Sequence, residues 1–148
     1  MQLSKNFYLS EFTKSQTASR RGINNQPGER EIANLKLLCE KVLQPTRDHF
    51  NQPIIISSGY RSPKLNRAIN GSSTSQHMQG QAADFEIPGI DNYDLAYWIW
   101  KNLNYDQLIL EFYTGGNSGW VHCGYSTRHK NEELTINNQG TFPGLKKY

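Results

Sequence analysis

Hydrophobic residues recur at helical spacing in two parts of the chain. Between residues 28 and 50 they return every three or four positions, which is the repeat of one helix face. Pro27 is expected in the first turn of this helix, and Pro45 is expected to bend it. A second helix is predicted over residues 91–103, with Asp91 as its cap and both of its tryptophans in the core.

Strand patterns occupy the segments between and after these helices. Residues 53–58 form a short apolar run typical of a buried strand, and residues 80–87 alternate between two faces. Residues 106–113 and 119–125 also alternate, and the Gly-rich stretch between them predicts a β-hairpin. A further strand is expected near residues 134–136.

The remaining segments are polar and rich in turn-forming residues. Residues 1–27 are expected to wrap around the surface, with a short helix near residues 9–13. Ser62 followed by Pro63 predicts the start of another brief helix. These elements predict an α+β fold, in one domain over residues 1–148, in which helices pack on one face of a small, mainly antiparallel sheet.

Composition narrows the function classes. The net charge of +3 is spread along the chain, so there is no basic stripe of the kind that nucleic-acid-binding proteins carry. Cys39 and Cys123 are too sparse for a disulfide framework and are expected as reduced core residues. The start of the chain lacks the apolar core of a signal peptide, and nowhere do 18 apolar residues run together. We therefore expect synthesis in the cytoplasm without a signal peptide, and no membrane insertion.

Three residues suggest a metal site. His77 lies just before the strand that carries Asp84, with Gly80 supplying a turn between them, and His122 lies on the second hairpin strand. Two imidazoles and one carboxylate suit a zinc ion, and three protein ligands leave one tetrahedral position for water. The pattern predicts one catalytic Zn²⁺ held by His77, Asp84 and His122.

A carboxylate is predicted beside this site. If the hairpin loop comprises residues 114–119, Glu111 lies directly opposite His122 and on the same face. Glu111 would then be a general base that takes a proton from the attacking water and passes it to the leaving amine. The alternative is an ordinary strand glutamate paired with a lysine or arginine.

Three further polar residues are candidates for binding substrate. Arg61 follows the apolar strand, where its guanidinium would stabilise an oxyanion or clamp a substrate carboxylate, unless it is simply a solvated surface residue. Ser75 would orient His77 or contact substrate, and Gln107 shares the predicted face of Glu111.

The motifs around these residues resemble the D-alanyl-D-alanine metallopeptidase superfamily, which includes zinc D,D-carboxypeptidases, D,D-dipeptidases and bacteriophage L-alanyl-D-glutamate endolysins. The match is Ser-x-His-x-x-Gly-x-Ala-x-Asp over residues 75–84, followed by Trp-Val-His at residues 120–122. Residues 58–66, 71–73 and 7–12 look like the phage and prophage branch of this superfamily. The resemblance implies zinc held by the two histidines and the aspartate, and it matches Arg61 to the family's substrate-binding or transition-state arginine.

One position departs from the family pattern. Better-known members place the catalytic Asp or Glu three residues before the last histidine, where this chain has Gly119. Our first hypothesis is a monomeric zinc peptidase of phage or prophage origin, with Glu111 as its base. It would cut peptidoglycan stem peptides as a carboxypeptidase or an endopeptidase. The second is a non-catalytic zinc domain, used in a virion or for wall binding, because relatives such as the hedgehog signalling domain keep this zinc site without evident hydrolysis.

Overall fold

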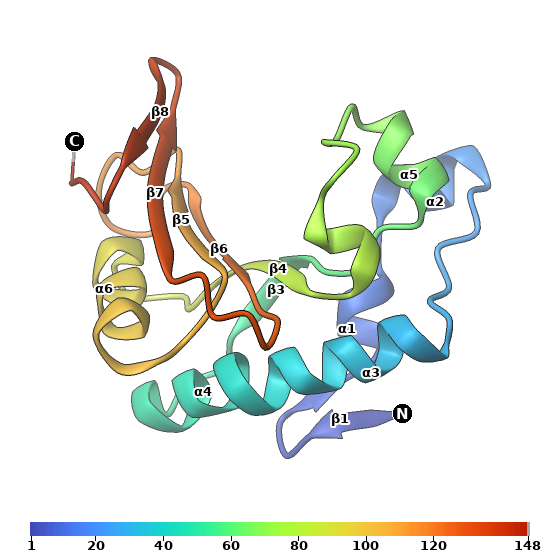
Figure 1. Ribbon diagram of the computed structural model, residues 1–148, viewed down its shortest axis with the longest axis horizontal. Coiled ribbons are helices and arrows are strands. Elements are labelled where there is room, and N and C mark those ends of the chain that lie inside the picture. The colour runs from blue at the N-terminus through green and yellow to red at the C-terminus, as the bar shows by residue number, and fades with distance from the viewer. Residues whose placement is uncertain (148) are drawn as a thin grey trace.

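A six-stranded mixed sheet is the framework of the fold, as the computed structural model shows (Figure 1). Its strand order is β3-β4-β6-β5-β7-β8, and only the β5–β7 pair among them is parallel. The strands are β3 (Ile55–Ser58), β4 (Ala82–Glu86), β5 (Gln107–Glu111), β6 (Trp120–Gly124), β7 (Glu132–Asn137) and β8 (Gly140–Pro143). The structure describes residues 1–147, so Tyr148, the end of the predicted tail, lies outside the described residues.

Helices cover one face of this sheet and leave the functional residues on the other. The inward side chains of the central strands pack with apolar residues of the long N-terminal helix and of α6 (Asn92–Asn102) into one buried core. Cys39 and Cys123 are both free thiols in this core, as expected. The predicted α+β class with a mainly antiparallel sheet is therefore confirmed.

The predicted helix at residues 28–50 is one continuous run with a widened turn. It consists of α3 (Glu29–Leu38), a π-helical turn (η1, Cys39–Leu43) and α4 (Gln44–Phe50). Pro45 has no N–H to donate, and the helix widens in the turn before it. The expected position of Pro27 was wrong, because the helix is capped at Gly28, whose N–H donates to Glu31 Oε1 at 3.0 Å.

Strand β3 is shorter and more exposed than predicted. It lies at the edge of the sheet and pairs only with β4, so Ile55 is 49% exposed and only the preceding Ile54 is buried. The helix expected after it is α5 (Pro63–Ala68), with Ser62 Oγ accepting from Leu65 N at 3.2 Å. The cap of α6 is also confirmed, since the Asp91 side chain accepts from Tyr93 N at 2.8 Å.

Two predictions about α6 and the hairpin were wrong in detail. Trp98 packs partly buried against the core, but Trp100 points outward and is 37% exposed. In the hairpin, Glu111 pairs with Trp120, and His122 pairs with Ile109. The strand ends early because Phe112 takes a left-handed backbone conformation, with φ of 54°. The register differs by two residues from the prediction, and an even shift keeps Glu111 on the face of His122.

The N-terminal segment wraps along the edge of the domain and contains more structure than predicted. The expected helix is α1 (Ser10–Thr13), and it is joined by β1 (Gln2–Ser4), β2 (Phe7–Tyr8) and α2 (Gln16–Arg21). The segment contacts the loop after β3, where Tyr60 N donates to Phe12 O at 2.7 Å. It thereby supports one wall of the site.

Candidate metal centre and active-site cleft

His77 is presented by a short 3₁₀ helix, η2 (Gln76–Gln79), whose two ends are capped. Ser75 Oγ accepts from His77 N at 3.2 Å, so Ser75 orients this residue through its backbone. The turn ends at Gly80, where φ is 70° and a Cβ atom would lie 2.3 Å from the carbonyl oxygen of Glu31. Only glycine satisfies both conditions there, which explains the Gly of the His-x-x-Gly motif.

The tautomer of His77 is fixed by its surroundings. Its Nδ1 lies 2.7 Å from the carbonyl oxygen of Gly59, which can only accept, so Nδ1 carries the proton. Nε2 is therefore left with its lone pair directed into the site, and this buried atom has no hydrogen-bond partner. Burial lowers the pKa of His77, which keeps the ring neutral and able to bind a metal.

Asp84 and His122 face each other on adjacent strands. β4 pairs with β6 so that these two residues are direct partners, and His122 Nδ1 lies 2.9 Å from Asp84 Oδ1. His77 Nε2 lies 3.4 Å from the same oxygen. Burial alone would raise the pKa of Asp84, but the hydrogen bond with His122 and the nearby ring of His77 outweigh it and lower the pKa, so the carboxylate is charged.

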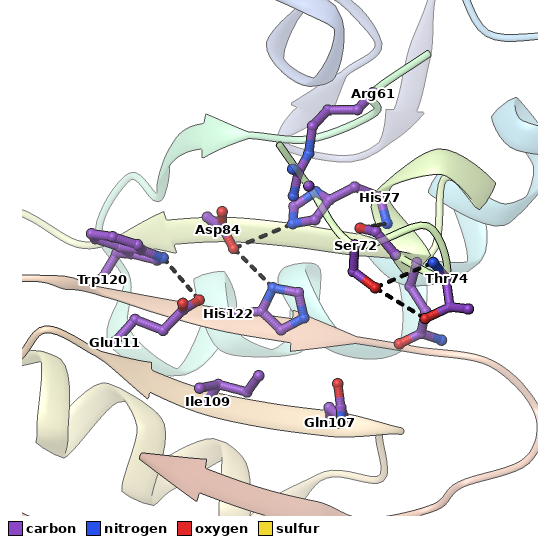
Figure 2. Close-up of a pocket in the computed structure, with 13 residues that line it drawn as sticks. Arg61, Ser72, Thr74, His77, Asp84, Gln107, Ile109, Glu111, Trp120 and His122 are labelled. Carbon is purple, nitrogen blue, oxygen red and sulfur yellow. Dashed lines mark hydrogen bonds and ion pairs between the residues drawn. The ribbon is translucent and has the colours of Figure 1, made fainter. Parts of the chain in front are cut away.

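The three side chains fit a metal ion. One ligand atom from each of His77, Asp84 and His122 lies within 4.8 Å of the other two. The unpartnered Nε2 and the shared carboxylate oxygen are aimed at a common point between the three residues (Figure 2). Two imidazole nitrogens and one carboxylate oxygen form a donor set that binds zinc and related divalent metals.

Glu111 lies beside this group, at the end of β5. Trp120 Nε1, from the neighbouring strand, donates to Glu111 Oε2 at 3.0 Å (Figure 2). Burial and the nearby charge of Asp84 raise the pKa of Glu111, although the hydrogen bond from Trp120 opposes the shift. A half-buried carboxylate with a raised pKa is suited to accepting a proton near neutral pH. The structure pairs Glu111 with no lysine or arginine side chain among the residues it describes.

Arg61 reaches the opposite side of the metal centre from the loop after β3. Its backbone N–H donates to His77 O at 3.1 Å, and its Nη1 donates to Asn66 Oδ1 at 3.2 Å. A Cβ atom at Gly71 would lie 3.0 Å from Nη1 and 2.1 Å from Asn66 Oδ1, so this glycine makes room for the pair. Burial lowers the pKa of Arg61, and its Nε has no partner. Arg61 lines the cleft, and a guanidinium has five N–H donors, of which the structure uses one in the bond to Asn66.

All the residues predicted to form the site line one cleft of about 580 Å³. Gln107 is among them, with its side-chain amide donating to Glu132 Oε1 at 2.7 Å. The sequence prediction missed six other lining residues, which are Gly71, Ser72, Thr74, Gln76, Ile109 and Trp120. Two of these had a usable signal, because Trp120 alternates with His122 and Ile109 with Glu111 along their strands.

Comparison with known proteins agrees with this geometry. A family model described as Peptidase M15 matches residues 5–124, which include every predicted site residue. A search of curated proteins found no match. No helix in residues 1–147 combines the length and the apolar character needed to cross a membrane. With the motifs of residues 75–84 and 120–122 meeting in one cleft, the chain belongs to the peptidase M15 family of metal-dependent peptidases.

Proposed function

We propose that this protein is a zinc-dependent peptidase that hydrolyses an amide bond in the stem peptides of bacterial peptidoglycan, as a carboxypeptidase or an endopeptidase. The observation that carries the proposal is the position of Glu111. Its half-buried carboxylate shares one cleft with His77, Asp84 and His122, and Arg61 lines the same cleft.

The roles of the residues follow from their chemistry. Zinc, when bound by the two histidines and the aspartate, would lower the pKa of a water molecule toward about 7 and polarise the scissile carbonyl. Glu111 accepts the proton that this water loses as it adds to the carbonyl carbon. The same carboxyl group then donates the proton to the amine nitrogen as the C–N bond breaks, which returns Glu111 to its charged form.

Arg61 is placed to hold negative charge on the substrate. Its Nε has no protein partner, and its Nη1 is oriented by Asn66. A guanidinium with free donors can bind a terminal carboxylate or the oxygen that becomes negative during the reaction. Ser75 is assigned a positioning role through the backbone of His77, and Gln107 contributes to substrate binding at the cleft.

We further propose a phage or prophage origin, supported by the resemblance of residues 7–12, 58–66 and 71–73 to that branch. A monomer made in the cytoplasm would reach the wall after release or as a virion component. Nucleic acid is not a proposed partner, because the basic residues are dispersed.

The alternative is a non-catalytic zinc domain that binds the cell wall or a virion. The observation that favours it is Gly119, which stands where better-known relatives carry a carboxylate. The two functions make different predictions for hydrolysis. A peptidase hydrolyses the wall and needs Glu111 as a proton acceptor, whereas a binding module does not hydrolyse the wall at all.

The deciding experiment compares wild-type protein with Glu111→Gln on purified cell-wall sacculi in the presence of zinc. Wild type is expected to release new amino termini, and Glu111→Gln is expected to lose this release by at least about a hundredfold while keeping its zinc content. The control is Glu86→Gln, which changes a β4 carboxylate that does not line the cleft. Mass spectrometry of the products identifies the bond. A fully zinc-loaded wild type that releases nothing would leave the binding module as the better explanation.

A further inference from the structure

Phe112 has a backbone conformation that its residue type disfavours. Its φ of 54° lies in the left-handed region, which a bulky side chain rarely adopts. Its N–H still donates to Ile136 O at 2.8 Å, so the residue is held by the neighbouring strand β7. Such strain persists only where the surrounding structure enforces it, and it is concentrated at functional sites.

The kink changes where the ring of Phe112 lies. In a regular strand Phe112 would point to the face opposite Glu111, together with the fully buried Leu110. Instead, its ring is 44% exposed and packs against Trp120, with ring centroids 5.4 Å apart and planes at 36°. Because Trp120 lines the cleft, the kink places a second aromatic ring beside the cleft's rim.

This aromatic pair gives the cleft two chemically different ends. Trp120 and Glu111 lie at one end, the metal-ligand group lies in the middle, and Ser72, Thr74 and Gln107 lie at the other end (Figure 2). The far end thus offers hydroxyl and amide groups, whereas the near end is lined by the ring of Trp120, against which the partly exposed ring of Phe112 packs. Exposed aromatic faces beside a proton-transferring carboxylate are suited to binding an apolar, C–H-rich group.

We propose that Phe112 and Trp120 form an apolar subsite that binds a C–H-rich group of the substrate next to the scissile amide. This inference rests on the proposed peptidase function and adds a specificity-determining residue, Phe112, to it. Two parts of a muropeptide have this chemistry, which are the aliphatic side chains of the stem peptide and the C–H face of a sugar ring.

The test uses Phe112→Asn, because asparagine tolerates the left-handed conformation and removes the ring without adding strain. With soluble muropeptides, kcat/KM is expected to fall about tenfold, chiefly through a higher KM, while zinc content and melting temperature stay at wild-type values. Phe112→Tyr keeps the ring, so its KM is expected to rise much less than that of Phe112→Asn. The matched control is Tyr97→Ala, which removes an aromatic ring of equal exposure from α6, outside the cleft.

Two substrates identify the bound group. If it is a stem-peptide side chain, Phe112→Asn loses activity equally on the free stem peptide and on the disaccharide-linked one. If it is a sugar ring, the loss is confined to the disaccharide-linked substrate. Unchanged KM on both substrates in an active enzyme overturns the subsite alone. A wild type that cleaves neither substrate overturns the proposed function instead. In that case calorimetry measures the affinity of wild type and Phe112→Asn for the muropeptide, and equal affinities overturn the subsite as well.

Discussion

At position 119 the backbone leaves no room for the carboxylate found in better-known relatives. Gly119 has φ of 64°, and a Cβ atom there would lie 2.0 Å from the carbonyl oxygen of Glu111 and 2.6 Å from that of Phe112. The β5–β6 loop that places Phe112 and Trp120 therefore requires glycine at this position. Besides Asp84 of the candidate metal group, the carboxylate that lines this cleft is Glu111, on the adjacent strand.

Restoring the relatives' carboxylate is accordingly expected to fail. Gly119→Asp should destabilise the protein by about 3 kcal/mol, because it combines a backbone clash with an unfavourable φ. It should also leave the Glu111→Gln variant inactive. Denaturant unfolding and sacculus digestion measure the two effects. Recovery of hydrolysis in the double variant would show that position 119 can hold a working carboxylate and would contradict the steric argument.

The indole of Trp120 is expected to set the pH at which Glu111 works. Its hydrogen bond stabilises the charged carboxylate and opposes the rise in pKa caused by burial and Asp84. Trp120→Phe removes this donor but keeps an aromatic ring, so the pKa of Glu111 should rise further. More of the base is then protonated at a given acidic pH.

The acid limb of the kcat/KM profile should therefore move to higher pH in Trp120→Phe, with a loss of about threefold on the acid side and little change at alkaline pH. Tyr97→Ala, on the outer surface of α6, provides the unshifted reference profile. An identical acid limb in wild type and Trp120→Phe would show that another group controls it.

Among the elements, the N-terminal segment supports the loop that carries Arg61, a role that its polar sequence does not predict. The buried Asn25 spans the backbone on both sides of Arg61. Its Nδ2 donates to Tyr60 O at 3.1 Å, and its Oδ1 accepts from Ser62 N at 2.7 Å. Asn25 thus fixes the loop from which the guanidinium enters the cleft.

Asn25→Ala leaves these two buried backbone groups unpaired. The free energy of unfolding should fall by about 2–3 kcal/mol, and KM should rise because Arg61 loses its fixed position. The exposed neighbour Asn24 makes only a local bond to Gln26 N, so Asn24→Ala is the matched control. Thermal unfolding and steady-state kinetics test the prediction. A normal KM in a destabilised Asn25→Ala would show that Asn25 stabilises the fold but does not position Arg61 for binding substrate.

The elements also show which parts of the fold the sequence predicts. Both long helices follow from apolar periodicity, because burial of one face requires that spacing, and Asp91 also marks the start of α6. The sheet face of the strand residues Asp84, Glu111 and His122 was also predicted correctly, because strand alternation survives a register shift of two. The β5–β6 register could not be predicted, because it depends on the left-handed φ of Phe112. The loop interactions impose this φ, and phenylalanine rarely adopts it. The segments β1, β2 and α2 are too short to show a period.

In the candidate site, the sequence predicted the charged residues and the candidate metal ligands. It missed six uncharged residues that line the same cleft. The joint pattern of His77, Asp84 and His122 predicted a shared site, and the structure brings the three residues together. Ser72, Thr74 and Gln76 are common polar residues whose position in the cleft follows from the path of the loop around α5 and η2. No pattern within the chain marks such a path in advance.

For the molecule as a whole, the metal centre joins segments that are far apart in the sequence. His77 precedes β4, Asp84 lies on β4, and His122 lies on β6, so the three ligand atoms are near one another only in the folded chain. A metal that binds this group therefore favours the folded state over the unfolded state. Stability should depend on metal even where no hydrolysis is measured.

Free zinc at about a hundred times its dissociation constant should add about 2.7 kcal/mol, which for a chain of this length raises the melting temperature by about 8 °C. Chelation should reverse the shift, and His122→Ala should abolish it because only two ligands remain. His129→Ala is the matched control, since His129 contacts Tyr125 outside the site and its loss should leave the zinc-dependent shift intact. Calorimetry with and without zinc measures all three proteins. An equal zinc shift in His122→Ala and wild type would place the bound metal somewhere other than between His77, Asp84 and His122.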